Sequence, residues 1–334
     1  MKIDNTKQMK YNIYFLIVGI LLSSCLDSSQ EKQGKSEKVK EIQEKKQKGN
    51  NSPTNHDQLR EVENKSDTTY ELSYFSGQAE ISTFTLNKAR YEGVHPGEAV
   101  LVFVAEPFLI DKQVKADHPT KENSVSVLKM NRIDRFSTGI YDYSLYTSVF
   151  TASKQFSAHY PLKITMGAQD WCGQTFTQIN NNNGFEYSHH SYFESEGDTA
   201  MHFNYAMTGD NMFNLARISP DLLPTGDFEI LPAVHYLRTS HCEIKTYNAK
   251  GSMTNVKGGK MYEYEIPALN RSVRITISDT NHHRITKWEE SYPTVFDDQI
   301  RTSTYELKGV KRIPYWKYNK KKYNGLRKDL KLLY

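Results

Sequence analysis

The sequence predicts an all-β protein, built as one large antiparallel sheet that is curled into a half-barrel or barrel and carries one short helix. Segments of roughly five to eight residues rich in Val, Ile, Thr, Tyr and Phe recur along the chain, with turn residues between them. Sustained 3.6-residue periodicity, which indicates helices, is nearly absent. Roughly 250 residues of such strands are many for one sandwich, so a curled sheet buries them more naturally.

The N-terminal residues have the pattern of an export signal. A lysine-rich region precedes the apolar run 13–22, which is about half of the roughly 20 residues that a membrane-spanning helix needs. The run ends in Leu-Ser-Ser-Cys, which resembles the bacterial lipobox, whose cysteine is acylated and becomes the new N-terminus. Residues 1–25 are therefore expected to be a lipoprotein signal peptide and lipobox, with lipidation at Cys25. An ordinary secretion signal with a chance cysteine is the alternative.

Several acyl chains together make a stable membrane anchor. The mean hydropathy is -0.68, and no second long apolar run follows the first. The protein is therefore expected in the cell envelope, lipid-anchored to the outer membrane or to a periplasmic membrane face. Residues 26–69 are almost devoid of apolar side chains and predict a disordered polar tether.

The all-β domain is expected over residues 70–318, and the segment 98–106 (EAVLVFVAE), apolar without alternation, is expected in the middle of the sheet. The short helix is expected from Asp210, a natural N-cap, to a stop at Pro220. The other expected strand segments are 79–90, around Val114, 125–130, 139–150, 162–166, 228–231, 233–237, 242–247, 261–266, 272–278, 284–288 and 302–307.

Residues 170–198 are expected to form one long hairpin around Asn183-Gly184, a dipeptide that favours turns in which both residues have positive φ. A two-residue turn at Asn183-Gly184 pairs residues whose numbers sum to 367, which sets Trp171 opposite Glu196 and Gly173 opposite Glu194. One face of this hairpin is the candidate ligand-binding site, where an aromatic ring stacks on a sugar or apolar body and carboxylates accept hydrogen bonds. Its residues are Trp171, Gly173, His190, Tyr192, Glu194 and Glu196. The alternative is that the carboxylates only solvate the hairpin while Trp171 packs in the core.

The two cysteines of the expected domain, Cys172 and Cys242, form a disulfide or remain buried free thiols. No zinc-ligand spacing, nucleophile elbow or phosphate-binding glycine loop is present, so no metal and no cofactor are expected. Adjacent strand residues point to opposite faces, so neither histidine doublet, 189–190 or 282–283, is expected to chelate a metal by itself. Both doublets are expected to be surface imidazoles.

The C-terminal residues 319–334 are expected to be a basic tail with interleaved aromatic residues. In an exported protein, such a tail faces lipid head groups or envelope polymers, and nucleic acid is not an expected partner. A solvated tail is the alternative.

Five segments of the chain carry a family resemblance: YFSGQAEI (74–81), HPGEAVLVFVAEPF (95–108), GIYDYSLYTSVF (139–150), QDWCGQTFTQ (169–178) and SYFESEGD (191–198). They resemble a family of Bacteroidetes lipoproteins, whose members often carry the label septum formation inhibitor Maf. Maf proteins themselves are cytoplasmic nucleoside triphosphate pyrophosphatases with a Ser-x-Ser-Pro-Arg-Arg motif, which this chain lacks. The curled sheet also resembles exported lipid-carrier folds of the lipoprotein-localisation type.

The sequence thus predicts a membrane-anchored binding or structural module for a lipid, a glycan or an envelope protein. The alternative is an extracytoplasmic hydrolase that uses Glu194 and Glu196, whose backbones lie about 7 Å apart if both are on one strand face. A Maf-type pyrophosphatase is the third hypothesis.

Overall fold

The computed structural model describes residues 76–153, 160–280 and 282–333, all within the unit Asn55–Tyr334. The expected signal peptide, the lipidation site Cys25 and the expected tether lie outside the described residues. Within these ranges no helix is both long and apolar enough to cross a bilayer.

In the part of the chain that the structure describes, sixteen strands form one sheet, and the helices are few and short. The strands are β1 (Ala79–Arg90), β2 (Gly93–Leu109), β3 (Val114–Lys115), β4 (Val125–Thr138), β5 (Tyr141–Ala152), β6 (Lys163–Asp170), β7 (Gln174–Asn181), β8 (Phe185–Ser191), β9 (Thr199–Phe203), β10 (Met207–Thr208), β11 (Gly226–Leu231), β12 (Tyr247–Val256), β13 (Gly259–Ile266), β14 (Arg271–Ser278), β15 (Ile285–Pro293) and β16 (Ile300–Ile313). The α-helices are α3 (Met212–Ile218), α4 (Val234–Ser240) and α5 (Leu326–Asp329). The short 3-10 turns are η1 (Pro220–Leu222), η2 (Pro267–Leu269), η3 (Tyr315–Lys317) and η4 (Lys321–Tyr323).

The sheet consists of two meanders joined edge to edge. The strand order is β10-β11-β12-β13-β14-β15-β16-β1-β2-β4-β5-β6-β7-β8-β9, with β3 attached to β2. Neighbouring strands are antiparallel throughout except β10 and β11, which are parallel. The first strand, β1, pairs with the last, β16. The first and last strands in sequence therefore lie in the interior of the strand order, whereas β9 and β10 lie at its ends.

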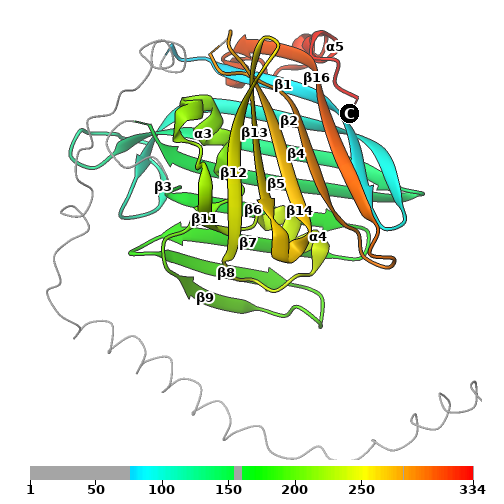
Figure 1. Cartoon of the computed structure of the whole chain (residues 1–334). Coiled ribbons are helices and arrows are strands. Elements are labelled where there is room, and N and C mark those ends of the chain that lie inside the picture. The colour runs from blue at the N-terminus through cyan, green and yellow to red at the C-terminus, as the bar shows by residue number, and fades with distance from the viewer. Residues whose placement is uncertain (1–75, 154–159, 281, 334) are drawn as a thin grey trace, which may run out of the picture. The chain divides into compact units, whose positions relative to one another are not determined.

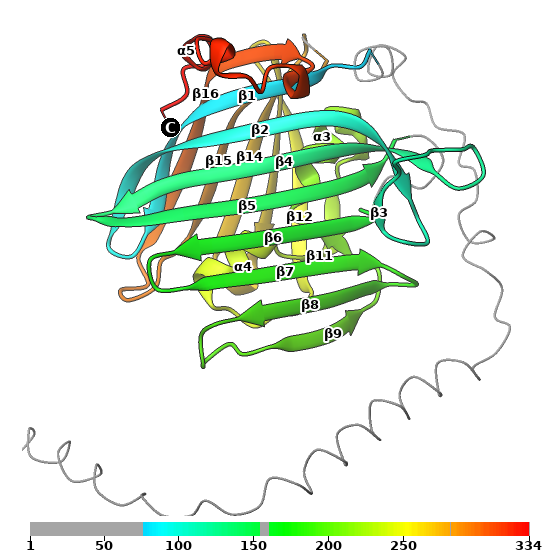
Figure 2. The same cartoon turned by 180° about the vertical axis from the view of Figure 1, so that it is seen from behind.

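The sheet curls so that its two meanders face each other, with α3 and α4 between them (Figure 1). Seen from behind, β2 to β9 form one wall and β11 to β15 the other (Figure 2). The sheet is not closed, because β9 and β10 end the strand order without pairing to each other. The predicted all-β class is therefore confirmed, in its half-barrel form.

The interior is filled by aromatic side chains from both walls. Trp288 on β15 stacks on Tyr305 of β16 at 4.0 Å between ring centroids, and it meets Phe84 edge-on at 4.7 Å. Phe213 of α3 contacts the same indole at 5.3 Å. All of α3 is buried, and Asn214 donates hydrogen bonds to the carbonyl oxygens of Leu128 and Val149. The helix therefore plugs the curl of the sheet.

Two of the strand predictions agree closely with the structure. The expected strand 79–90 coincides with β1, and the apolar segment 98–106 lies in β2, near the centre of the strand order. One predicted strand is wrong: residues 233–237 form most of helix α4, and Ala233 is its N-cap. The predicted strand 242–247 is also wrong, because β12 begins only at Tyr247.

The predicted helix exists as α3, but its N-cap is Asn211 rather than Asp210. The Asp210 carboxylate instead accepts a hydrogen bond from the backbone N–H of Val234, the first residue of α4, at 2.9 Å. Asp210 thus caps the helix that the sequence did not predict. This contact spans 24 residues, which explains why local pattern reasoning missed it.

The C-terminal segment is fixed to the sheet near its end. Thr83 donates a hydrogen bond to the carbonyl oxygen of Leu330 at 2.6 Å, and the N–H of Leu333 donates to Glu98 at 2.8 Å. Leu330 is buried. Figures 1 and 2 both show α5 beside β16 and β1, far along the sheet from β9.

Candidate ligand-binding site

A cavity of about 670 Å³ opens between strands β8 and β9 on one side and helix α4 on the other. Ligand sites in proteins typically enclose about 300–1,000 Å³. The residues that line it are Thr177, Tyr187, His189, Ser195, Glu196, Thr199, Met201, Val234, Leu237, Arg238, His241, Cys242, Glu243 and Ile244. One side of the cavity is therefore apolar and the other carries charged and hydrogen-bonding groups.

Glu196 is the centre of the polar side. Its Oε1 accepts a hydrogen bond from Arg238 Nη1 at 3.1 Å and lies 3.1 Å from His241 Nδ1. Its Oε2 accepts a hydrogen bond from Ser191 Oγ at 2.7 Å and lies 3.4 Å from His189 Nε2. We call these five residues the Glu196 cluster.

The Glu196 carboxylate remains ionised over a wide pH range. Burial raises the pKa of Glu196, but the hydrogen bond from Ser191 and the charge of Arg238 outweigh this effect, so the pKa is lowered. Burial, together with the positive charge of Arg238, lowers the pKa of His241. At neutral pH the cluster therefore presents a carboxylate that is paired with one guanidinium.

Helix α4 contributes side chains to both the apolar and the polar side of the cavity. Val234, Leu237, Arg238 and His241 recur at the spacing i, i+3, i+4 and i+7, which places them on one helix face. His241 ends the helix in the left-handed conformation, with φ of 53°. The cavity wall is therefore one stripe of a single short helix.

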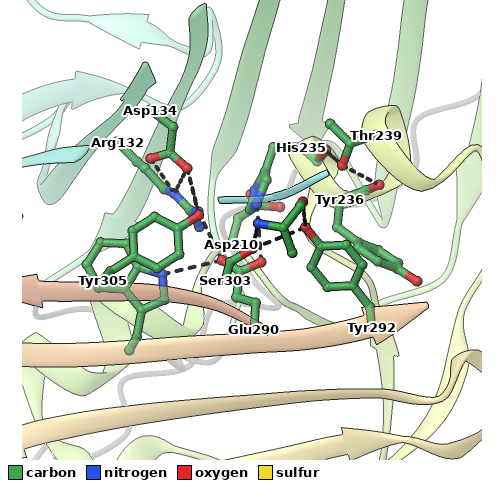
Figure 3. Close-up of polar contacts among 12 residues, drawn as sticks. Arg132, Asp134, Asp210, His235, Tyr236, Thr239, Glu290, Tyr292, Ser303 and Tyr305 are labelled. Atoms are coloured by element: carbon green, nitrogen blue, oxygen red, sulfur yellow. Dashed lines mark hydrogen bonds and ion pairs between the residues drawn. The ribbon is translucent and has the colours of Figure 1, made fainter. Parts of the chain in front are cut away.

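Beside this stripe, α4 is held at His235 by a buried ionic cluster, which Figure 3 shows. His235 Nε2 lies 3.4 Å from Glu290 Oε2, and the other oxygen of this carboxylate lies 2.9 Å from Arg132 Nη2. Arg271 Nη2 donates to Glu290 at 3.1 Å. Arg132 also binds Asp134, at 2.7 Å. Buried charges thus fix α4 at His235, while its stripe of lining residues faces the cavity.

Two buried groups, His235 of the ionic cluster and the nearby Asp210, have strongly shifted pKa values. Burial is the main cause for both: it raises the pKa of Asp210 to about 7 and lowers the pKa of His235 to about 4. Burial also raises the pKa of Glu290, but the charge of Arg132 outweighs it and holds the pKa well below its usual range. His235 is therefore neutral at pH 7, and Glu290 is the charged partner.

The structure separates most of the predicted site residues. Glu196 alone of the six lines the cavity. Trp171 is 61% exposed and lies 5.9 Å from the ring of Tyr141, while His190 points outward and pairs with Asp198 at 3.2 Å. Glu194 is exposed and is not among the lining residues.

Gly173 and Tyr192 do lie together, as their assignment to one face implied. A Cβ at Gly173 would stand 2.7 Å from Tyr192 Cδ1, so the absence of a side chain lets the ring approach. Tyr192 is 76% exposed. Neither Tyr192 nor Trp171 lines the cavity.

The hairpin itself is confirmed, but its register differs by one residue from the prediction. Its loop has three residues, Asn182–Gly184, and Thr175 pairs with Ser191, so paired numbers sum to 366. Asn183 and Gly184 have positive φ, as predicted. A one-residue shift exchanges the faces of the strands, and β7 begins only at Gln174. The pairs expected for Trp171 and Gly173 with Glu196 and Glu194 therefore do not form.

The predicted disulfide is not formed. Cys172 lies exposed in the turn between β6 and β7, whereas Cys242 is half-buried and lines the cavity. The turn that carries Cys172 is fixed by Asp170 Oδ1, which accepts hydrogen bonds from the backbone N–H groups of Cys172 and Gly173. The expectation of surface histidines is wrong for His189, which is buried and hydrogen-bonded to Thr177 at 2.8 Å.

Sequence reasoning missed Val234, Leu237, Arg238 and His241. Their helical spacing was the available signal, but the segment had been assigned to a strand. It also missed the buried ionic cluster, whose members Arg132, Asp134, His235, Arg271 and Glu290 come from four separate elements. Across the described ranges, no group of three or more His, Cys, Asp and Glu side chains is arranged to hold a metal ion.

Comparisons with known proteins give one similarity. No protein-family model matches the chain, and no curated protein matches it. Among solved structures it is similar to a beta-barrel-like protein of the domain of unknown function DUF1849 from Brucella abortus. The TM-score is 0.35 and the sequence identity is 6%, over 70% of this chain and 97% of that chain.

Proposed function

We propose that this protein is a membrane-anchored envelope lipoprotein that binds a small amphiphilic molecule of the lipid class. The cavity beside α4 is the observation that carries the proposal. Its volume of about 670 Å³ suits part of an acyl chain with its polar end, and its two sides differ in chemistry as such a ligand requires.

The apolar side of the cavity contacts the ligand body. Val234 and Leu237 are rigid parts of α4, and Met201 on the edge strand β9 is 40% exposed. Methionine adapts to irregular apolar shapes, which suits a binding wall. Burying apolar ligand surface here contributes about 25 cal/mol per Å².

The polar side orients the ligand head group. The Arg238 guanidinium is shared between Glu196 Oε1 at 3.1 Å and Asp170 Oδ2 at 3.9 Å. His189 and His241 lie beside the same carboxylate. This set offers both donors and acceptors to a polar head, such as a hydroxyl or ester group.

The envelope location is a proposal that rests on the sequence of residues 1–25, with acylation at Cys25. The resemblance to Bacteroidetes lipoproteins supports the same location. A body that hangs from a membrane by acyl chains is exposed to lipid molecules, which is consistent with the chemistry of the cavity.

Titration of the purified full-length protein with a fluorescent acyl-chain probe tests the proposal. We expect saturable binding, weakened on the order of tenfold by Met201→Trp, because overpacking a binding site costs about 1–3 kcal/mol. Ile300→Trp, at an exposed site outside the cavity, is the matched control and leaves binding unchanged. Failure of the wild-type protein to bind, or equal binding by Met201→Trp, would reject the proposal.

A hydrolase that uses Glu194 and Glu196 as a pair has less support. Catalysis at a glycosidic bond needs two carboxyl groups that face each other across a space of about 5–10 Å. Of these two residues only Glu196 lines the cavity, and its oxygens are occupied by four neighbouring side chains. The absence of the Ser-x-Ser-Pro-Arg-Arg motif leaves the Maf-type pyrophosphatase hypothesis without residues to carry it.

A further inference from the structure

The C-terminal segment of the structure carries a concentration of positive charge that the cavity does not use. Seven basic side chains lie between residues 315 and 333, and all are exposed: Lys317, Lys320, Lys321, Lys322, Arg327, Lys328 and Lys331. We call these seven the basic surface. Within the described residues, none of them forms an ion pair with a carboxylate.

The few carboxylates nearby are already occupied. Asp329 is the one acidic residue of the segment 315–333, and it pairs with Lys311 of β16. Glu98 on β2 accepts from Lys308 at 2.6 Å and from the backbone N–H of Leu333 at 2.8 Å. The positive charge of the basic surface is therefore left for a partner outside the chain.

The basic surface is held in place and does not hang free. The backbone contacts of Leu330 and Leu333 fix the segment onto β1 and β2, and η3, η4 and α5 give it local structure. A Cβ at Gly309 would stand 2.8 Å from the carbonyl oxygen of Leu330, so the segment lies directly against β16. The charges thus have a fixed arrangement on the outside of the sheet.

Exposed aromatic side chains lie among the charges. Tyr315 is 37% exposed, Trp316 is 45% exposed and Tyr318 is 38% exposed. Trp and Tyr favour the interface between water and lipid, where the ring is partly buried and its polar group stays hydrated. Nucleic acid also attracts basic and aromatic residues, but an anionic bilayer is the polyanion that an exported, lipid-anchored chain encounters.

We propose that the basic surface docks on a bilayer that contains anionic phospholipids. Each Lys or Arg near such a surface contributes about 1 kcal/mol, and the attraction decays within a Debye length of about 8–10 Å. The aromatic residues then enter the head-group region. This contact would hold the sheet against the membrane with β9 and the cavity far along the sheet from it, as the positions of α5 and β9 in Figures 1 and 2 allow.

The proposal takes its cellular setting from the proposed membrane anchor, but its test does not depend on acylation. The full chain with Cys25→Ser, which cannot be acylated, is mixed with vesicles of neutral phosphatidylcholine or of phosphatidylcholine with phosphatidylglycerol. The readout is the difference in affinity between the two vesicle types, which removes any contribution of the apolar run 13–22.

We expect the chain to prefer the anionic vesicles, and high salt to abolish the preference. Lys320→Gln, Lys321→Gln and Lys322→Gln together should reduce the affinity for anionic vesicles on the order of 100-fold, at about 1 kcal/mol for each charge. The matched control replaces Lys112, Lys250 and Lys257, which are exposed lysines elsewhere, and should leave affinity within about twofold.

Trp316 provides a second readout. Lipids brominated near the head group should quench the tryptophan fluorescence of the Cys25→Ser chain on anionic vesicles, and Trp316→Phe should remove most of this quenching. Equal affinity for the two vesicle types, or an unchanged affinity of the triple variant, would overturn the proposal. Binding to a nucleic acid or polysaccharide without binding to anionic vesicles would also overturn it. None of these outcomes affects the acyl-probe titration of the cavity.

Discussion

Two carboxylates in this protein have similar neighbours and different surroundings. Glu290 is bound by Arg132, Arg271 and His235 at 2.9, 3.1 and 3.4 Å. Glu196 is bound by Arg238, His241 and His189 at 3.1, 3.1 and 3.4 Å. The Glu290 side chain is 2% exposed, whereas the Glu196 side chain is 17% exposed and lines the cavity.

Helix α4 connects the two carboxylates. His235 contacts Glu290, and Arg238, three residues further along the helix, contacts Glu196. The same donor types therefore serve two purposes. Where water is excluded, they hold the helix in the core, and where a cavity is open, they remain accessible to a ligand. Burial, rather than residue type, distinguishes the structural cluster from the candidate site.

The largest expected effect is on stability, from Glu290→Gln. Removing this charge leaves Arg271 buried without a carboxylate, and breaking a buried pair in this way costs about 3–5 kcal/mol. Chemical denaturation measures the free energy of unfolding. The matched variant Glu196→Gln should cost about 1 kcal/mol or less, because its surroundings are partly hydrated. Equal losses in the two variants would break the comparison.

The next effect concerns the pH dependence of stability, through Asp210. The pKa of this carboxyl is raised to about 7 in the folded protein, so the folded state binds the proton more tightly than the unfolded state, where the pKa is 3.8. Stability from this group is fully present below pH 3.8 and is lost as the pH rises to about 7. Asp210→Asn should therefore gain stability relative to wild type between pH 4 and 7, by up to about 4 kcal/mol.

Asp134→Asn is the control for this pH dependence. The Asp134 pKa is lowered: burial raises it, but the charge and hydrogen bond of Arg132 outweigh that effect. Asp134 therefore stays ionised in both states from pH 5 to 7, and its variant should differ from wild type by a constant amount there. The lowered pKa of His235 adds stability as the pH rises through 4 to 6.5, but wild type and variants share this contribution.

The smallest expected effect comes from the two cysteines. Because Cys172 and Cys242 are free, reduction should leave the Tm unchanged within about 1 °C, whereas a disulfide closing roughly 70 residues would contribute up to ~4 kcal/mol. Exposed Cys172 should react rapidly with a thiol reagent in the Cys25→Ser chain, and half-buried Cys242 slowly. A drop in Tm on reduction, absent in Cys172→Ser, would contradict the structure.

The hairpin shows how far local pattern reasoning reaches. Its strands and the positive φ of Asn183 and Gly184 follow from the residues themselves. The register does not, because two-residue and three-residue loops fit the same dipeptide, and one residue of shift exchanges the faces. Glu196 lines a cavity, but the side chains around it are not those that the predicted register places there.

The sequence by itself determined that the described part of the chain is a sheet. Apolar and polar residues that alternate along a segment separate onto two faces only when the segment is a strand. Its composition also predicts the export signal and the basic C-terminal residues. Only the tertiary structure decided that residues 234–240 form a helix, because its cap, Asp210, and its partner, Glu290, are distant in sequence. That helix brings Arg238 and His241 to Glu196, so the candidate site depends on long-range contacts that no local pattern contains.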